Sequence, residues 1–277
     1  MKKSERKAAI IRTIIVALIA VLFVTPLVWM VLSSLKTPQE VFARPFHWLP
    51  AKVQWQNYVS VWMNEEASML RAFINTLYIA LFSITGQMLI SSLAAYSFAK
   101  IKFKGKNFIF LLFLSSMMIP SQVTIIPRFM LFKTIGLYNN LWAIILPAFF
   151  GATSIFMLRQ FYMGLPNDLI EAAKIDGAGH LRIFVRIMLP LTKAALMSLI
   201  ILAFISNWNE YMGPLIFLVK KELYTVSQNI QWYMLDEYKE HNLTMAAATS
   251  AIVPIIILFI VGQKYFVEGI ATSGVKG

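Results

Sequence analysis

The sequence predicts an all-α fold: a polytopic membrane bundle of six transmembrane helices, with one short helix in a loop on the cytoplasmic side. The chain has 277 residues, of which 58% are hydrophobic and only 14% are charged. A soluble domain of this length carries about 25% charged residues, so the deficit favours a membrane protein. The apolar residues gather in six stretches, each close to the roughly 20 helical residues that cross a bilayer.

The six predicted spans differ in how regular they are. The first follows a basic start, Met1–Lys7, and its apolar run is too long for a signal peptide, so we expect it to remain as an anchor. Pro120, Pro127 and Pro147 interrupt the third and fourth, which membrane helices tolerate where neighbours satisfy the freed backbone groups. In order, the predicted spans are Thr13–Leu32, Thr76–Ala99, Phe108–Ile126, Leu141–Leu158, Leu191–Asn209 and Met245–Phe266.

The distribution of charge predicts the orientation. With six spans, both termini lie on one side, and that side holds 16 of the 25 Lys and Arg residues but only 5 of the 13 acids. Cytoplasmic loops carry the Lys and Arg excess, so we expect both termini in the cytoplasm. The predicted organisation is a cytoplasmic N-terminus (1–12), one six-span domain (13–269) with its long cytoplasmic loop at 159–190, and a cytoplasmic tail (270–277). External loops are expected near 33–75, 127–140 and 210–244.

Composition also excludes several chemistries. There is no cysteine, and the three histidines (His47, His180 and His241) are too far apart for metal-ligand spacing, so we expect no metal site and no catalytic residues. No phosphate cradle of the form Gly-x-x-x-x-Gly-Lys-Ser/Thr occurs; the nearest approach is Lys-Gly-Lys at 104–106. Membrane topology accounts for the net charge of +12, so nucleic acid is not an expected partner.

The segment Leu165–Pro190 predicts two short helices separated by a break. Pro166 and then Asn167 or Asp168 provide a helix start signal, and Gly177 is expected to end the first helix in the left-handed conformation. The second helix should run from about His180 to Met188. It would place Arg182 and Arg186 on one face and Leu181, Phe184 and Met188 on another.

This segment resembles the EAA loop of permeases from ABC importers. The resemblance rests on Glu171, Ala172, Ala173, Asp176 and Gly177, followed by Phe184, Leu189 and Pro190. Further motifs are similar to carbohydrate permeases related to the second maltose-transporter permease subunit: Asn75-Thr76-Leu77, Trp208-Asn209-Glu210 with Pro214-Leu215, and the terminal Gly274–Gly277. The resemblance covers most of the chain from about residue 70 onward.

The resemblance implies the function and the partners. The chain would be a permease subunit of a binding-protein-dependent sugar importer in a bacterial or archaeal cytoplasmic membrane. In that family the loop at 159–190, called here the coupling loop, contains the coupling helix that docks on a separate ATPase. The implied partners are a second permease, two ATPase subunits, an extracytoplasmic sugar-binding protein and the lipid bilayer. ATP and magnesium would bind to the partner ATPase, and the chain itself would need no cofactor.

Polar residues near the predicted spans are candidates for lining the pathway. Intramembrane polar groups cost free energy and often mark transport routes, although small hydroxyl and amide side chains also join helices by hydrogen bonds. Both interpretations remain open. The candidates are Asn207, Asn209, Glu210, Gln87 and Gln122, with Ser91, Ser92, Ser115 and Ser116 as further polar positions.

The aromatic-rich external segment Gln228–His241 has two interpretations of equal weight. It is an interfacial aromatic belt, or, as the resemblance implies, part of a loop that probes the sugar-binding protein. The residues expected to make that contact are Asp236, Glu237, Tyr238, Lys239 and Glu240.

Three alternative functions are weighed against the sugar permease. An ABC permease for a non-sugar solute fits the coupling loop but not the carbohydrate-type motifs. A secondary transporter should show an intramembrane ion-coupling carboxylate or paired broken helices, and no acid lies deep in any predicted span. A membrane-embedded enzyme would need a nucleophile or metal constellation, which the sequence does not contain.

Overall fold

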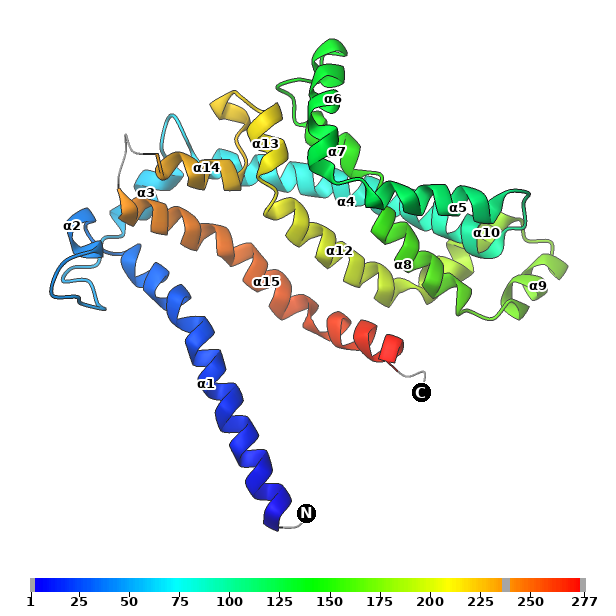
Figure 1. Ribbon diagram of the computed structural model, residues 1–277, viewed down its shortest axis with the longest axis horizontal. Helices are drawn as coiled ribbons and strands as arrows, with labels where there is room; N and C mark the ends of the chain where they lie inside the picture. The colour runs from blue at the N-terminus through cyan, green and yellow to red at the C-terminus, as the bar shows by residue number, and fades with distance from the viewer. Residues whose placement is uncertain (1–2, 236–239, 275–277) are drawn as a thin grey trace. The chain divides into compact units, whose positions relative to one another are not determined.

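The computed structural model describes residues 3–235 and 240–274, and the regular structure of these residues is entirely helical (Figure 1). Contacts divide the chain into two compact units, Met1–Leu70 with Asn229–Val253, and Arg71–Gln228 with Pro254–Gly277. The helices, in order, are α1 Lys3–Ser33, α2 Pro38–Val41, α3 Gln56–Trp62, α4 Met69–Lys100, α5 Lys106–Ser115, η1 Ser116–Met118, α6 Ser121–Thr134, α7 Trp142–Ala148, α8 Ala152–Met163, α9 Asp168–Ile175, α10 His180–Ile183, η2 Phe184–Met188, α11 Leu189–Leu191, α12 Lys193–Trp208, α13 Met212–Phe217, η3 Lys221–Leu223, α14 Val226–Tyr233 and α15 His241–Gly274.

Four helical stretches in the described residues are long and apolar enough to cross a membrane by themselves: Ala9–Ser33, Met69–Lys100, Trp142–Met163 and His241–Gln263. Two bent helix pairs raise the number to six when each pair counts as one span. The first, second, fourth and sixth predicted spans correspond to the four single stretches. The third and fifth correspond to the bent pairs, so the all-α membrane fold expected from the sequence is confirmed.

The third span bends by 95° between Lys106–Met118 and Ser121–Thr134. Pro120 separates the two helices, and the preceding Ile119 is extended, with φ −84° and ψ 113°. A proline disfavours the helical conformation of the residue before it, and its own nitrogen cannot donate to the preceding turn. The bend is therefore a local consequence of the Ile119-Pro120 pair.

The helix pair that contains the predicted fifth span bends by 76° between His180–Leu191, most of which belongs to the coupling loop, and Lys193–Trp208. Its first part contains a π-helical turn, Phe184–Met188, in which the Leu189 N–H donates to the Phe184 carbonyl. At the bend, the fully buried Thr192 hydroxyl donates to the Met188 carbonyl at 2.9 Å. Such π turns occur as single insertions inside α-helices, frequently at functional sites.

The first unit is held together by hydrogen bonds among buried polar groups. The Asn57 side chain donates to the carbonyls of Ser34 and Lys36 at 2.8 and 2.9 Å and accepts from Asn242 at 3.0 Å. The Tyr233 hydroxyl donates to the Ala67 carbonyl at 3.2 Å, and burial raises the pKa of this hydroxyl to about 12. These contacts join the end of α1, the loop before α4 and the start of α15.

The second unit has its main core beside the coupling loop. Tyr96 of α4 and Tyr162 of α8 meet edge to face at 6.3 Å, and Phe184 lies 5.4 Å from the Tyr96 ring. Ile183 and Met188 are fully buried in the same cluster. Residues from α4, α8, α9, α10 and α12 thus share one apolar core, which gives the coupling loop a packed foundation.

Candidate functional site

The coupling loop forms the two short helices that the sequence predicts, with a glycine between them. Gly177 has a φ of +78°, and its N–H donates to the Lys174 carbonyl at 3.0 Å. The Ala178 N–H donates to the Ala173 carbonyl at 2.9 Å, and both alanines touch the apolar core. This pair of hydrogen bonds is a Schellman motif, which ends helices at a glycine in the left-handed conformation. The predicted role of Gly177 as the end of this helix is confirmed.

One side of the two helices is buried and the other is open. Ile170 and Ala173 of α9 and Ile183 of α10 lie in the core. Ile175 is 87% exposed and Leu181 is 71% exposed, and Glu171 on α9 is also exposed. Large apolar side chains with this exposure lie outside the packed core, and the charged side chains of Glu171, Asp176 and Arg182 in the same segment are exposed as well.

One detail of the predicted coupling loop is wrong. Leu181 does not share a face with Phe184 and Met188, because the helix turns Ile183 inwards and leaves Leu181 outside. Asn167 stands at the start of α9, but its side chain makes no capping hydrogen bond. Its side-chain oxygen accepts instead from the Lys100 ammonium at 2.7 Å, an interaction with the end of α4 that local sequence patterns do not contain.

The remaining coupling-loop residues divide between surface and core. Ala172 and Asp176 are exposed with Glu171 and Gly177, whereas Phe184 is buried and Leu189 is half-buried. Pro190 is exposed and stands two residues before the bend at Thr192. Of the eight residues, four on the α9 side are exposed, Ala173 lies in the core, and the group from Phe184 to Pro190 shapes the turn behind them.

Three side chains of α4 and α8 fix the coupling loop and the helices beside it, and the sequence analysis did not identify their contacts. Lys100 donates to the Leu165 carbonyl at 2.7 Å as well as to Asn167. The Tyr96 hydroxyl lies 3.0 Å from Nδ1 of His180, the first residue of α10. Arg159 donates to the Phe98 carbonyl at 3.3 Å, and its guanidinium lies 4.1 Å from the Phe110 ring centroid. Only the polar character of these residues at span ends was available as a signal.

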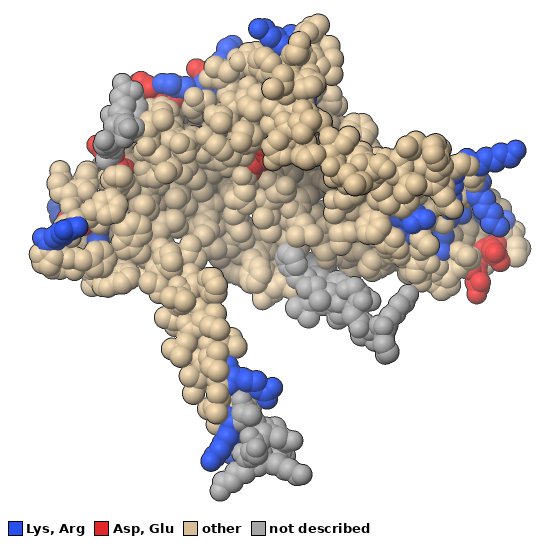
Figure 2. All heavy atoms as spheres, in the orientation of Figure 1, with Lys and Arg blue, Asp and Glu red and all other residues tan. Residues whose placement is uncertain are grey.

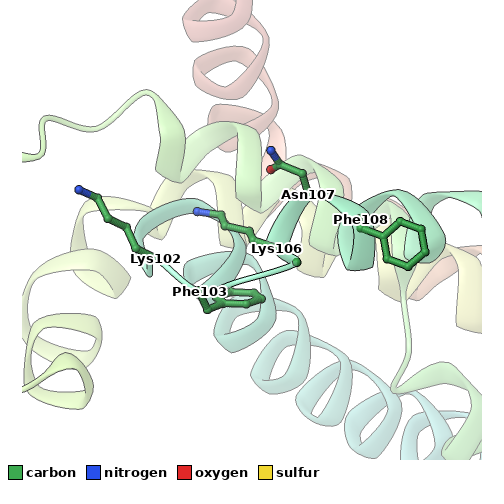
Figure 3. Close-up of a pocket in the computed structure, with 6 residues that line it drawn as sticks. Lys102, Phe103, Lys106, Asn107 and Phe108 are labelled. Carbon is green, nitrogen blue, oxygen red and sulfur yellow. The ribbon is translucent and has the colours of Figure 1, made fainter.

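A basic pocket lies at the turn between α4 and α5 (Figure 3). Lys102, Phe103, Gly105, Lys106, Asn107 and Phe108 line it. The Lys106 ammonium points back to the end of α4, where it donates to the carbonyls of Ala99 and Ile101 at 3.2 and 3.0 Å. Lys102 and Phe108 are exposed, and the Lys102 side chain points away from α4 (Figure 3).

The candidate pathway residues make local hydrogen bonds. Asn207 and Asn209 each donate to a carbonyl of their own helix at 2.8 Å. Gln87 joins α4 to α8 through a hydrogen bond to the Ser154 hydroxyl at 3.0 Å. The Glu210 carboxylate accepts from the Gly213 N–H at 2.8 Å and so supports the start of α13. Gln122 is exposed beside Pro120.

The expected binding-protein contact lies mostly outside the described residues. Asp236, Glu237, Tyr238 and Lys239 are in this group, so the structure does not place them. Glu240 is exposed, and its carbonyl accepts from the N–H groups of Leu243 and Thr244 at the start of α15. Among the described residues, no group of three His, Asp or Glu residues is arranged to hold a metal ion.

The described residues form helices only, and four to six of their helical stretches could span a membrane, which is the architecture of a multi-span membrane protein. The chain belongs to the family described as binding-protein-dependent transport system inner membrane component, whose profile matches residues 87–272. That family assignment identifies the chain as a transport subunit of the membrane and not as an enzyme.

Relatives of known description match nearly the whole chain. The arabinooligosaccharides transport system permease proteins of Halalkalibacterium halodurans and Bacillus subtilis are each 33% identical over 267 residues, covering 96% of this chain and 95% of theirs. The sn-glycerol-3-phosphate transport system permease protein of Pectobacterium atrosepticum is 31% identical over 266 residues, covering 94% of each chain.

Solved structures show the same fold. A chain from the crystal structure of a bacterial ABC transporter involved in the import of the acidic polysaccharide alginate has a TM-score of 0.84 at 22% identity. The match covers 96% of this chain and 99% of that one. A second alginate ABC transporter structure, in complex with a periplasmic protein that holds an alginate pentasaccharide, matches with a TM-score of 0.70 at 14% identity.

Proposed function

We propose that this chain is a transmembrane permease subunit of an ATP-driven, binding-protein-dependent sugar importer. It forms half of the translocation path and couples to a separate ATPase, which binds ATP and magnesium. The transport family, the oligosaccharide permeases among its relatives and the fold all support this function. The observation that carries it is the exposed surface of α9 and α10, which rests on a firmly packed base.

The coupling surface combines apolar side chains with one carboxylate. Ile175 and Leu181 offer apolar area that no other described residue covers, and Glu171 adds an exposed negative charge. Ile183, Phe184 and Met188 pack into the core and so fix the buried side of the coupling loop. A partner that moves this surface therefore moves the helices behind it, as a rigid-body switch requires.

The proposed orientation places both termini and the coupling loop in the cytoplasm, because that side holds the Lys and Arg excess. The tail 270–277 would then contact the ATPase pair, and residues 236–240 would contact the sugar-binding protein outside. Asn207, Asn209, Glu210, Gln87 and Gln122 remain proposed pathway residues. In the described structure each of the first four has a local hydrogen-bond partner, which also fits a purely structural role.

The proposed cycle needs two permeases and two ATPases. ATP-driven closure of the ATPases would draw the coupling loops together and open the path to the outside. The binding protein would then deliver its sugar, and hydrolysis would return the path to the inward state. Linkage requires the reciprocal effect, so docking of the loaded binding protein should raise ATP use.

Docking is tested by a charge placed on the exposed apolar surface. Ile175→Asp should leave the protein inserted but release the ATPase during purification, because the side chain is 87% exposed and has little part in folding. Leu49→Asp, at a 72% exposed apolar position outside the coupling loop, is the matched control. Glu171→Ala should weaken ATPase retention about five-fold, since a partly exposed ion pair contributes about 1 kcal/mol. Full retention in Ile175→Asp would contradict the proposed docking surface.

A second candidate function is the import of a phosphorylated polyol, because one relative is a glycerol-3-phosphate permease at 31% identity. Uptake of labelled arabino-oligosaccharides and of sn-glycerol 3-phosphate by cells that overproduce the complete system distinguishes the two. Uptake of the oligosaccharide alone supports the sugar importer. Uptake of the phosphate ester alone contradicts it and supports the import of a phosphorylated polyol.

A further inference from the structure

We infer that α4 is the element that links the coupling loop to the segment at residues 222–228, called here the outer segment, and that Asn75 and Thr76 are the positioning residues at its outer end. The inference rests on the proposed function and identifies the residues that carry its coupling. All the contacts that support it lie within the second unit.

At one end, α4 holds the outer segment through two adjacent side chains. The Asn75 amide donates to the carbonyls of Glu222 and Tyr224 at 2.8 and 3.1 Å. The Thr76 hydroxyl oxygen accepts from the Val226 N–H at 2.9 Å, and both Thr76 and Val226 are 1% exposed. Three backbone groups of the outer segment thus depend on α4 for a partner.

These groups lie in the short turn η3 (Glu222), in the link after it (Tyr224) and at the first residue of α14 (Val226), whose N–H has no partner within its own helix. The Val226 N–H is buried, and a buried N–H without a partner costs free energy, so the Thr76 hydroxyl is specific to this position of the segment. Asn75 adds a side-chain bridge between two carbonyls that are not buried. The Gln228 amide also fixes the outer segment, because it donates to the carbonyls of Pro214 and Leu218 at 3.1 Å each. The outer segment is therefore fixed to α4 and α13.

At the other end, α4 holds the coupling loop. The Tyr96 hydroxyl lies 3.0 Å from Nδ1 of His180, and Lys100 binds the Leu165 carbonyl and the Asn167 side chain. Thr76 and Tyr96 are twenty residues apart, or about 30 Å along a helix, which is close to the thickness of a bilayer's hydrocarbon core. In the proposed topology, α4 therefore contacts the outer segment at one face of the membrane and the coupling loop at the other.

The helix between these two ends is continuous. Of the four stretches that are long enough to span a membrane alone, α4 is the one without a proline; the others contain Pro26, Pro147 and Pro254. Prolines and inserted side chains are the usual causes of helix kinks, so α4 has the least capacity to absorb a displacement by bending. Movement at the coupling loop should appear at the outer segment.

The outer segment leads, within about ten residues of sequence, to Asp236–Glu240, the proposed contact with the binding protein. A binding protein that displaces the outer segment would, through Asn75 and Thr76, also displace α4. The displacement would reach the coupling loop through Tyr96 and Lys100. Contiguous rigid elements of this kind can carry coupling, provided that both sites bias the same element.

The test measures ATP hydrolysis by the complete importer in lipid nanodiscs, with and without saturating sugar-loaded binding protein. Asn75→Asp, which keeps the size but loses both N–H donors, and Thr76→Val, which loses the acceptor, should reduce the stimulation at least three-fold. Basal hydrolysis and the amount of assembled complex should stay near the wild-type values. Thr76→Ser retains the acceptor and should restore the stimulation. Ser97→Ala is the control on the same helix, because its hydroxyl donates only to the Leu93 carbonyl of α4.

A double-mutant comparison tests whether the two ends act through one element. Tyr96→Phe should also reduce the stimulation, and Thr76→Val combined with Tyr96→Phe should reduce it no further than the stronger single variant. The inference would be overturned if the double variant lost stimulation by the product of the two single losses. Full stimulation in Asn75→Asp and Thr76→Val would overturn it as well. If the wild-type complex shows no stimulation by any loaded binding protein, the proposed function fails first.

Discussion

Gly177 and Gly179 form a natural pair for separating backbone strain from contact at the coupling loop. A Cβ added at either glycine meets no atom within 4 Å, so neither position is crowded. They differ in conformation, since Gly177 has a φ of +78° and Gly179 has a φ of −71° with ψ 164°. Only the first lies in the left-handed region where a side chain is strained.

We expect Gly177→Ala to disturb the coupling loop by about 1 kcal/mol or more, whereas Gly179→Ala should be close to neutral. Gly177→Asp should have the stronger effect, because it also adds a charge beside the docking surface. The measurements are membrane abundance, retained ATPase and sugar uptake. Gly177 variants should insert normally and lose ATPase retention or coupling, about five-fold for the alanine. If uptake falls only in proportion to abundance, or if both alanine variants behave alike, the coupling role of Gly177 is wrong.

At the same scale, residue contacts were predictable when their cause was local. Gly177 was correctly expected to end its helix, since a glycine after a run of helix formers carries that signal in the sequence itself. Asn167 was expected to be part of a helix start and is found there, but its side chain binds Lys100, which is 67 residues away. Tyr96 and His180 meet for the same reason, through the fold. A single sequence contains no pattern that pairs such distant residues.

At the scale of the helices, the positions of the membrane spans could be predicted from their apolar lengths, but the geometry of their bends could not. The bend at Pro120 could be anticipated because proline breaks the hydrogen-bond ladder of a helix, and a break before Thr192 was expected at Pro190, but the angles of the two bends could not be predicted. Thr192 lies between Pro190 and Lys193, and its hydroxyl bonds back to Met188. Such side-chain hydrogen bonds bend helices when the surrounding packing favours them, and that packing is not visible in the sequence.

The contact between α4 and the α7–α8 turn depends on a close approach at Gly86. A Cβ at this position would lie 2.3 Å from a carbon of the Phe149 ring, which is too close for any real contact. Gly86→Ala should therefore destabilise the purified complex by about 1–3 kcal/mol, the usual cost of overpacking a well-filled site. Thermal unfolding in detergent measures the loss.

Two variants make that result specific. Phe149→Leu reduces the ring to a smaller side chain and should recover part of the stability lost in Gly86→Ala. Gly164→Ala should be nearly neutral, because its nearest contact, the Phe161 carbonyl oxygen, is at 3.4 Å. Equal losses in Gly86→Ala and Gly164→Ala would show that the close approach does not limit stability.

At the scale of the whole molecule, the proposed orientation in the membrane rests on the distribution of charge. Figure 2 shows Lys and Arg side chains gathered where α5 and α10 lie, with acidic side chains beside α9. The chain contains no cysteine, so it is a natural background for labelling single introduced cysteines. Exposed positions on both sides of the proposed membrane are available for that purpose.

We expect Lys104→Cys and Asp176→Cys to react with a membrane-impermeant maleimide in inverted vesicles and to stay unlabelled in intact cells or spheroplasts. Lys52→Cys should show the opposite pattern, because it lies in the segment between α1 and α4 that the charge distribution places outside. All three positions are exposed, so burial does not explain a lack of reaction. Labelling after permeabilisation provides the control for total reactivity. Reaction of Asp176→Cys in intact cells would place the coupling loop outside, where no cytoplasmic ATPase could reach it, and would contradict both the orientation and the coupling that depends on it.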